Sequence, residues 1–274
     1  MSTAYHKPKK FFGQHFLSDK NVLNKIVAAA KIAPGDVVLE VGPGTGELTE
    51  VLLEAGAYVV AIEIDRDLTT SLKQRFARFE NFRLIEKDAL KVSYLELGRE
   101  YGSKLKAVSN LPYNISGPIT AKFVEEREAF SIMVLMYQKE VARRLCAQPG
   151  NKDYGALTVI TRIHADVKIA FDVPRTIFRP PPKVDSSVVV IAPRPHKDAK
   201  DIDEKFFKEV VRAAFSTRRK TLHNALKSLD CPQEAVLEAI AQCGIDPKRR
   251  GETLDINEFA RLTNAISTAL KNIP

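Results

Sequence analysis

The sequence predicts an α/β protein, in which a mostly parallel sheet with helices on both faces precedes a small all-α domain. Short β-branched runs alternate with helical patterns between Asp36 and about Ala192, and a glycine turn follows the first run. Past Pro193 the apolar residues recur at helical spacing. A length of 274 residues suits two unequal domains, and we expect them at residues 1–194 and 195–274.

The first predicted domain alternates strands and helices, which is typical of βαβ units and a parallel sheet. The expected strands are Val37–Val41, Tyr58–Glu63, Phe82–Ile85, a run that precedes Asn110, and Ile132–Tyr137. The expected helices are Gly46–Ala55, Asp67–Phe79, Ile119–Glu126 and Lys139–Leu145. The last two runs, Asp166–Val173 and Ser186–Ile191, are joined by a segment with four prolines, which excludes a continuous helix there. They predict a closing antiparallel hairpin.

The second predicted domain begins after Pro193-Arg194-Pro195. Its expected helices are Asp203–Phe215, Thr217–Leu229, Glu234–Cys243 and Ile256–Leu270. Proline and glycine interrupt the pattern at Cys231-Pro232 and between Gly244 and Gly251, where we expect turns.

The excess positive charge is carried by the two ends of the chain. There are 42 Lys and Arg against 34 Asp and Glu, a net charge of +8. Residues 1–30 hold five basic residues and one acidic residue, and residues 191–274 hold 15 and 12. A single basic cluster is often only a solvated surface, but three around a nearly neutral middle indicate a nucleic-acid partner. The residues concerned are Lys9, Lys10, Arg218, Arg219, Lys220, Lys248, Arg249 and Arg250.

The composition excludes several classes of protein. Hydrophobic residues make up 45% and charged residues 28%, as in an ordinary globular chain and unlike a disordered one. No apolar run approaches the roughly 18 residues of a membrane helix, and no apolar stretch follows the basic N-terminus as in a secretory signal. The three cysteines form no CxxC pair. We expect a reduced, cytoplasmic protein without a structural metal site.

A glycine-rich turn, Glu40-Val41-Gly42-Pro43-Gly44-Thr45-Gly46-Glu47, joins the first strand to the first helix. Such a turn lets the backbone approach a ligand closely at the carboxyl edge of a sheet. It is not a P-loop, because Glu47 and Leu48 follow Gly46 where Lys and Ser or Thr are required. Its third glycine also comes one residue early for a dinucleotide fingerprint, and Glu47 would face the pyrophosphate. A dinucleotide is therefore disfavoured.

Two carboxylates at successive strand ends indicate what the turn binds. Glu63 ends the second strand, 21 residues after Gly42, where it can accept hydrogen bonds from both hydroxyls of a ribose. Asp88, followed by Ala89, ends the third strand and is placed to reach an adenine amino group. The ligand then has an adenosine, no phosphate, and a positive charge that suits acidic walls. S-adenosylmethionine meets these conditions, although either carboxylate alone could be only an exposed strand-end residue.

The motif Asn110-Leu111-Pro112-Tyr113 follows the fourth strand and suits methylation of an exocyclic amine. The lone pair of adenine N6 is delocalised into the ring, so the nitrogen must become pyramidal before it attacks. The Asn110 oxygen and a backbone carbonyl fixed by the following proline can accept both N–H bonds, which makes catalysis mainly positioning and preorganisation. Tyr113 can stack on a base that has left its own stack. The same four residues could also form an ordinary turn.

A second aromatic ring is expected from the proline-rich segment. Phe178 lies in Ile177-Phe178-Arg179-Pro180-Pro181-Pro182, a stiff segment that could present the ring as the other half of an aromatic sandwich around the base. An anchor in the hydrophobic core is the alternative. Arg175 and Arg179 could contact phosphates or be only solvated.

These motifs resemble those of the ribosomal RNA adenine N6,N6-dimethyltransferases. The resemblance also rests on Gly13-Gln14-His15-Phe16-Leu17, on Phe178 to Ser186, on Phe215-Ser216-Thr217-Arg218-Arg219-Lys220-Thr221-Leu222, and on Arg250-Gly251-Glu252-Thr253-Leu254. It covers about residues 10–265 and implies a Rossmann-like class I methyltransferase domain that uses S-adenosylmethionine. It implies cofactor contacts at His15, Leu17, Gly42, Glu63, Asp88 and Asn110, to which the neighbouring Gly44 and Ala89 are added. Many members have Asn where this chain has His15, and alanine is usual at Gly251.

The chain is most similar to the KsgA (RsmA) branch of this family. That implies methyl transfer to N6 of two adjacent adenosines in the 3′-terminal hairpin loop of small-subunit (16S) ribosomal RNA during ribosome biogenesis, with S-adenosylhomocysteine as the other product. The basic clusters would then bind RNA, and neither a metal, a membrane nor an oligomer is implied. Three alternatives stay open: an Erm-type enzyme acting on large-subunit (23S) RNA, an assembly checkpoint that acts mainly by binding the small subunit, and a DNA adenine methyltransferase.

Overall fold

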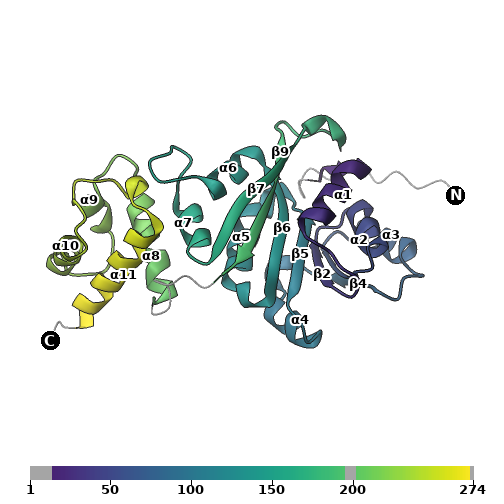
Figure 1. Ribbon diagram of the computed structural model, residues 1–274, viewed down its shortest axis with the longest axis horizontal. Coiled ribbons are helices and arrows are strands. Elements are labelled where there is room, and N and C mark those ends of the chain that lie inside the picture. Colours follow the sequence, from purple (N-terminus) through teal and green to yellow (C-terminus); the bar gives the residue numbers. More distant parts are fainter. Residues whose placement is uncertain (1–13, 195–201, 272–274) are drawn as a thin grey trace. The chain divides into compact units, whose positions relative to one another are not determined.

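The computed structural model describes residues 14–194 and 202–271, which divide into two compact units (Figure 1). The first unit holds the described residues up to Ala142 together with Asp166–Pro193. The second holds Arg143–Ala165 and the described residues from Arg194 onward. The expected domains differ from these units in the segment Arg143–Ala165. Its buried side chains, among them Tyr154 and Ile163, pack in the hydrophobic core of the second unit.

The first unit is built on a seven-stranded sheet of strand order β4-β3-β2-β5-β6-β9-β7. Its strands are β2 (Val37–Val41), β3 (Tyr58–Glu63), β4 (Phe82–Glu86), β5 (Leu105–Asn110), β6 (Phe130–Gln138), β7 (Ala165–Val173) and β9 (Ser186–Pro193). The strands from β4 to β6 pair in parallel, and β9 pairs antiparallel with β6. The closing strands predicted from the sequence are present, with β9 between β6 and β7. The predicted fold class, a mostly parallel α/β sheet followed by a helical part, is confirmed.

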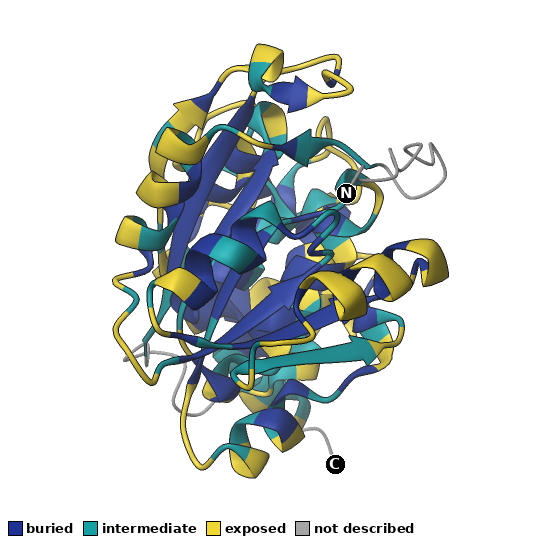
Figure 2. Ribbon diagram, turned by 90° about the vertical axis from the view of Figure 1, so that its right-hand side faces the viewer, coloured by how far each residue is buried: buried dark blue, intermediate teal, exposed yellow. Residues whose placement is uncertain are grey.

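Helices flank this sheet at mostly predicted positions. They are α1 (Lys20–Ala29), α2 (Glu47–Glu54), α3 (Arg66–Arg75), α4 (Tyr94–Glu100), α5 (Ser116–Glu125) and α6 (Lys139–Cys146). The sequence did not predict α1 and α4. It also extended α3 to Phe79, whereas the helix ends at Arg75 and the Phe76 ring packs against those of Phe79 and Phe82. Figure 2 shows the central strands as the buried layer and the outer helix faces as exposed.

The order of the sheet reverses beside β2. From β2 the chain continues to β3 and β4 on one side, and later returns to β5 and β6 on the other. In open α/β sheets, ligands bind in the crevice that such a switch point leaves at the carboxyl ends of the strands. The glycine turn follows β2, and Asn110 ends β5. The two motifs expected to carry the chemistry therefore meet at this crevice.

A separate two-stranded sheet joins distant segments of the first unit. β1 (Phe16–Leu17) pairs antiparallel with β8 (Phe178–Arg179), with Phe16 opposite Arg179 and Leu17 opposite Phe178. The pairing fixes residues 14–17, which we call the strap, next to residues 174–185, which we call the proline loop. Two-residue strands have no periodicity in the sequence, so this contact was not predicted.

The second unit is helical. Its helices are α7 (Ala156–Arg162), α8 (Glu204–Phe215), α9 (Leu222–Leu226), α10 (Gln233–Gln242) and α11 (Ile256–Lys271). The sequence missed α7, and the expected helix over Thr217–Leu229 is wrong in length, since α9 has five residues. Lys220 N–H bonds the Thr217 carbonyl in a turn, and Leu222 N–H bonds the Arg249 carbonyl, so tertiary contacts replace the helical ones. Across both described ranges, no helix is long and apolar enough to cross a membrane.

Candidate active site

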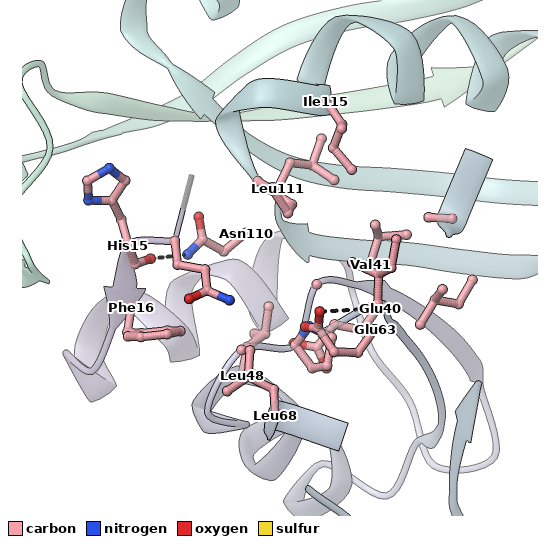
Figure 3. Close-up of a pocket in the computed structure, with 18 of the residues that line it drawn as sticks. His15, Phe16, Glu40, Val41, Leu48, Glu63, Leu68, Asn110, Leu111 and Ile115 are labelled. Atoms are coloured by element: carbon pink, nitrogen blue, oxygen red, sulfur yellow. Dashed lines mark hydrogen bonds between the residues drawn. The ribbon is translucent and has the colours of Figure 1, made fainter. Parts of the chain in front are cut away.

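A cavity of about 290 Å³ opens at the switch point of the sheet (Figure 3). Its walls come from the strap, the glycine turn and the segments that follow β3, β4 and β5. The lining includes each residue predicted to contact the cofactor, namely His15, Leu17, Gly42, Gly44, Glu63, Asp88, Ala89 and Asn110. It also includes Leu111, Pro112 and Tyr113 of the reactive motif. The structure brings these residues together, and their contacts with a ligand stay predictions.

The glycine turn is packed between the strap and the reactive motif. Gly42, Gly44 and Gly46 have φ angles of 69°, 61° and 95°, in the left-handed region that favours glycine. A Cβ atom added at Gly42 would meet Pro112 at 2.9 Å, and one added at Gly44 would meet the Phe16 ring at 2.9 Å. Larger residues would therefore be strained here and would push the strap and the reactive motif apart.

Arg75, the last residue of α3, holds the same turn from its other side. The guanidinium donates to the Thr45 carbonyl, to Glu47 at 3.3 Å and to Glu50 at 2.9 Å. Glu47 also accepts a hydrogen bond from the Thr45 hydroxyl. A carboxylate in the first turn of a helix is favoured by the helix dipole, so Glu47 stabilises the start of α2 while it adds negative charge to the cavity wall.

Backbone groups hold the two strand-end carboxylates. One oxygen of Glu63 accepts hydrogen bonds from the N–H groups of Ile64 and Asp65, both at 2.9 Å, and burial raises the Glu63 pKa. Asp88 accepts from Leu90 N–H at 3.0 Å and begins a short 3₁₀ turn. Ile64, which is 52% exposed, and Leu90 also line the cavity. Both residues follow closely after a predicted carboxylate in the sequence. This position could have predicted that they line the cavity, but we did not single them out.

Glu40 is a further cavity residue that sequence reasoning did not single out. It is 1% exposed and accepts a hydrogen bond from the Thr49 hydroxyl at 2.6 Å. Burial, with smaller contributions from the charges of Glu47 and Glu63, raises the pKa of Glu40 to about 8. Figure 3 shows Glu40 and Glu63 close together, with Asn110 on another side of the cavity.

The strap orients the amide of Asn110. Its Nδ2 donates to the His15 carbonyl oxygen at 3.0 Å (Figure 3). A backbone carbonyl can only accept, so this bond fixes which way the amide faces. The amide oxygen is then the half that is available to accept N–H bonds from an incoming amine. The reactive motif requires this acceptor.

The side chains of His15 and Tyr113 lie next to each other beside this amide. Their ring centroids are 5.3 Å apart, with 31° between the planes. The Tyr113 and Ser186 hydroxyls share a hydrogen bond of 2.7 Å, and burial raises the pKa of Tyr113. His15 Nδ1 lies 2.7 Å from the Pro180 carbonyl, to which it donates. This nitrogen is therefore engaged by the proline loop, and Nε2 is the one left for the predicted cofactor contact.

Phe178 does not lie where we expected it. Its side chain is 1% exposed, belongs to the hydrophobic core and does not line the cavity. Pairing of β8 with β1 sets Phe178 opposite Leu17, which is buried as well. The expected aromatic sandwich is therefore corrected: Phe178 anchors the proline loop in the core, which was the alternative for this side chain.

The two basic clusters of the second unit are neighbours. Hydrogen bonds from Leu222 N–H to the Arg249 carbonyl and from His223 N–H to the Pro247 carbonyl join the two segments that carry them. The exposed basic residues of these segments are Arg218, Arg219, Lys220, Lys248 and Arg250. Lys9 and Lys10 lie outside the described residues.

Arg249 has a different environment from its neighbours. Its guanidinium donates to both carboxylate oxygens of Glu258 and to the Thr253 carbonyl. The hydrogen bond with Arg249 lowers the pKa of Glu258. The RNA contact predicted at Arg249 stays a prediction, and the structure adds a contact within the unit.

No three His, Cys, Asp or Glu side chains in residues 14–194 and 202–271 are placed to hold a metal ion together.

Known proteins resemble this chain over nearly its whole length. The sequence profile of the family described as ribosomal RNA adenine dimethylase matches residues 5–268. The ribosomal RNA small subunit methyltransferase A of Bacillus cytotoxicus is 47% identical over 265 residues, covering 94% of this chain and 91% of the relative. The protein of the same name from Moorella thermoacetica is 44% identical over 266 residues, covering 94% and 92%.

Solved structures share the fold. The crystal structure of a dimethyladenosine transferase from Plasmodium falciparum gives a TM-score of 0.80 at 30% identity, over 93% of this chain and 98% of that one. The 23S rRNA methyltransferase ErmE gives a TM-score of 0.69 at 24% identity, over 92% and 99%. At this lower identity, the likeness concerns the fold alone.

Proposed function

This chain belongs to the ribosomal RNA adenine dimethylase family, and we propose that it transfers methyl groups from S-adenosylmethionine to N6 of adenosines in small-subunit (16S) ribosomal RNA. Two adjacent adenosines in the 3′-terminal hairpin loop are the proposed targets, modified during ribosome biogenesis in the cytoplasm. The products are N6,N6-dimethyladenosine and S-adenosylhomocysteine. One observation carries the proposal: the Asn110 nitrogen is bound by the His15 carbonyl, which leaves the amide oxygen as an acceptor beside the cavity.

The cavity residues fit S-adenosylmethionine, which supplies an electrophilic methyl group on a positively charged sulfur. Glu63 lies at the strand end where a carboxylate holds ribose hydroxyls, and Asp88 is available for the adenine amino group. Ile64 and Leu90 offer apolar surfaces to the faces of the adenine. Glu47, Glu63 and Asp88 bring carboxyl groups to the cavity wall, which suits a ligand that carries a positive charge.

Asn110 acts on the amine that receives the methyl group. Its oxygen accepts one N–H bond of adenine N6, and the carbonyl of Leu111, fixed by Pro112, accepts the other. Both bonds favour a pyramidal nitrogen whose lone pair can attack. Neutral acceptors suffice, because methyl transfer leaves an uncharged thioether and the proton can depart afterwards. Catalysis is then positioning and electrostatic preorganisation.

Tyr113 holds the base that carries this amine. Its ring can stack on an adenine that has left the RNA stack, and a hairpin loop avoids most of the cost of unpairing. The second methylation needs room for the first methyl group beside Asn110. The monomethylated amine keeps one N–H bond, which the amide oxygen can still accept.

The exposed basic residues of the second unit are proposed to bind RNA phosphates. They are Arg218, Arg219, Lys220, Lys248 and Arg250, with Lys9 and Lys10 of the N-terminal arm added from the sequence. Contacts of this kind give an affinity that falls steeply as salt is raised. We propose that the protein acts as a monomer.

Transfer of labelled methyl groups to small ribosomal subunits that lack the loop modification tests this function. We expect N6,N6-dimethyladenosine in the small subunit and none in free large-subunit RNA. Asn110→Ala should slow transfer by roughly 100-fold or more, because a transition-state acceptor is lost. Asn24→Ala, an exposed amide on α1, is the matched control and should keep wild-type activity.

Two experimental results would contradict the proposed function and favour another one. Label in large-subunit RNA would move the protein to the Erm-type activity. Absence of label in both RNAs, with measurable binding of S-adenosylmethionine and of small subunits, would favour a checkpoint that acts by binding.

A further inference from the structure

The proline loop is the green turn between β7 and β9 in Figure 1. It has more positively charged side chains than take part in hydrogen bonds within the loop. It holds Arg175, Arg179 and Lys183 against one carboxylate, Asp185. Asp185 accepts the Arg175 backbone N–H at 3.0 Å, and the Arg175 guanidinium donates to the Lys183 carbonyl at 3.1 Å. Arg175 is therefore bound within the loop, and Asp185 is used to cap its backbone.

Arg179 and Lys183 are different. Both side chains are exposed, and neither makes a hydrogen bond or ion pair to any part of the chain that the structure describes. The backbone that carries them is nevertheless well held: Arg179 pairs with Phe16 in the small sheet, and the next side chain before it, Phe178, is buried. Two cations without partners among the described residues thus lie on a backbone that is held in place.

That scaffold is joined in its middle and just past its end to the residues around the reactive motif. The Pro180 carbonyl, next to Arg179, accepts from His15, whose ring lies beside that of Tyr113. Past the other end of the loop, the Ser186 hydroxyl bonds the Tyr113 hydroxyl. The loop therefore stands next to the ring on which the target base is proposed to stack. When a base is bound there, its sugar and phosphates must pass nearby.

We propose that Arg179 and Lys183 bind phosphates of the RNA strand next to the extruded adenosine. The inference rests on the proposed function for the identity of the nucleic acid. A guanidinium can bind phosphate through two N–H groups at once, and a lysine adds a point charge. Phosphate contacts fix the register of a strand without reading its sequence. The loop thus positions the adenosine, while selection of the RNA lies with other surfaces.

Binding of a labelled RNA hairpin with the sequence of the target loop tests the inference in the full-length protein. The variants are Arg179→Gln, Lys183→Gln and the double variant. Each lost contact should weaken binding roughly fourfold at 0.15 M salt and reduce the slope of log K against log salt by about 0.7, the value for single strands. Calorimetry should show unchanged affinity for S-adenosylmethionine, because neither side chain lines the cavity.

Lys168→Gln is the matched control, since it removes the same charge from an exposed position on β7. It should leave the affinity and the salt slope at wild-type values. A double variant that behaves like Lys168→Gln would overturn the inference. If wild-type protein binds the hairpin with the expected salt slope but methylates no RNA, the proposed function fails while the phosphate site stands. Equal weakening of cofactor binding in the variants would mean that the loop has a structural role instead.

Discussion

At the scale of single residues, Glu40 places a buried acid in the wall of the cavity. With its pKa raised from 4.5 to about 8, the folded protein keeps a proton on Glu40 between these values, whereas the unfolded chain releases it. The folded state then binds more protons, so stability falls as pH rises through this window. Each pH unit costs up to about 1.4 kcal/mol. A buried acid of this kind is costly, which is typical of functional sites.

Glu40→Gln should remove this pH dependence. The amide stays neutral and keeps an oxygen for the Thr49 hydroxyl. Relative to wild type, we expect the melting temperature of the variant to rise by about 5 °C between pH 5.5 and pH 8. Thermal unfolding at the two pH values measures this effect, and an identical offset at both would contradict it.

Single residues were predictable where chemistry needs a particular side chain after a strand. Asn110, Glu63 and Asp88 were found in this way, and the structure gathers them in one cavity. Phe178 was wrong because its burial depends on a partner more than 160 residues away, Leu17 of β1. The contact of Arg249, which lies in a turn, with Glu258 of α11 was not predicted either. A local pattern has no access to either contact.

At the scale of elements, the strap links the two halves of the cavity. Gln14 Nε2 donates to Asp65 at 3.0 Å, and Asp65 N–H donates to Glu63. The next residue, His15, accepts from Asn110 through its carbonyl. The side chain expected to hold the ribose and the side chain expected to hold the amine are thereby connected through two adjacent residues of the strap.

A reciprocal exchange tests this link. Gln14→Glu sets a carboxylate against buried Asp65, and we expect affinity for S-adenosylmethionine and kcat each to fall about tenfold, equivalent to about 1.4 kcal/mol. Adding Asp65→Asn reverses the direction of the hydrogen bond and should restore most of both. Gln74→Glu, an exposed position on α3, controls for the added charge. Failure of the second change to rescue the first would show that the contact does not couple the two sites.

Elements were predictable where they are long and periodic. The parallel strands, α2, α8 and α11 were placed within a few residues of their observed ends. The predicted helix over Thr217–Leu229 was wrong because hydrogen bonds to the segment before Arg250 hold its first part as a turn. β1 and β8 are too short to leave a periodic signal, yet they position the strap.

At the scale of the whole molecule, some basic residues stabilise the fold and others are proposed to bind RNA. Arg249→Ala removes the hydrogen bonds to Glu258 and Thr253, so we expect the second unit to lose about 1–2 kcal/mol of stability. Arg218→Ala, at an exposed position, should change stability by less than about 0.5 kcal/mol but weaken RNA binding. Urea denaturation and the salt dependence of RNA binding separate the two effects. Equal loss of stability in both variants would contradict the division.

The division of the chain into two units was only partly predictable from the sequence. The change of composition after Pro193 marks one boundary of the second unit. The other cannot be seen in composition, because it falls between Ala142 and Arg143, within α6, and the two parts of this helix differ only in what they pack against. Tyr154 shows the reason: its hydroxyl donates to the Leu254 carbonyl, 100 residues further along the chain.

The bond between Asn110 and the strap explains why an amide, and not a carboxylate, stands at this position. A carboxylate would accept N–H bonds from adenine at least as well, but it would meet the His15 carbonyl with a second acceptor, and the two would repel. An amide offers a different group at each end, one for the protein and one for the substrate. The His15 carbonyl thus requires Asn and not Asp at position 110. A different acceptor at this position would first require a change in the strap.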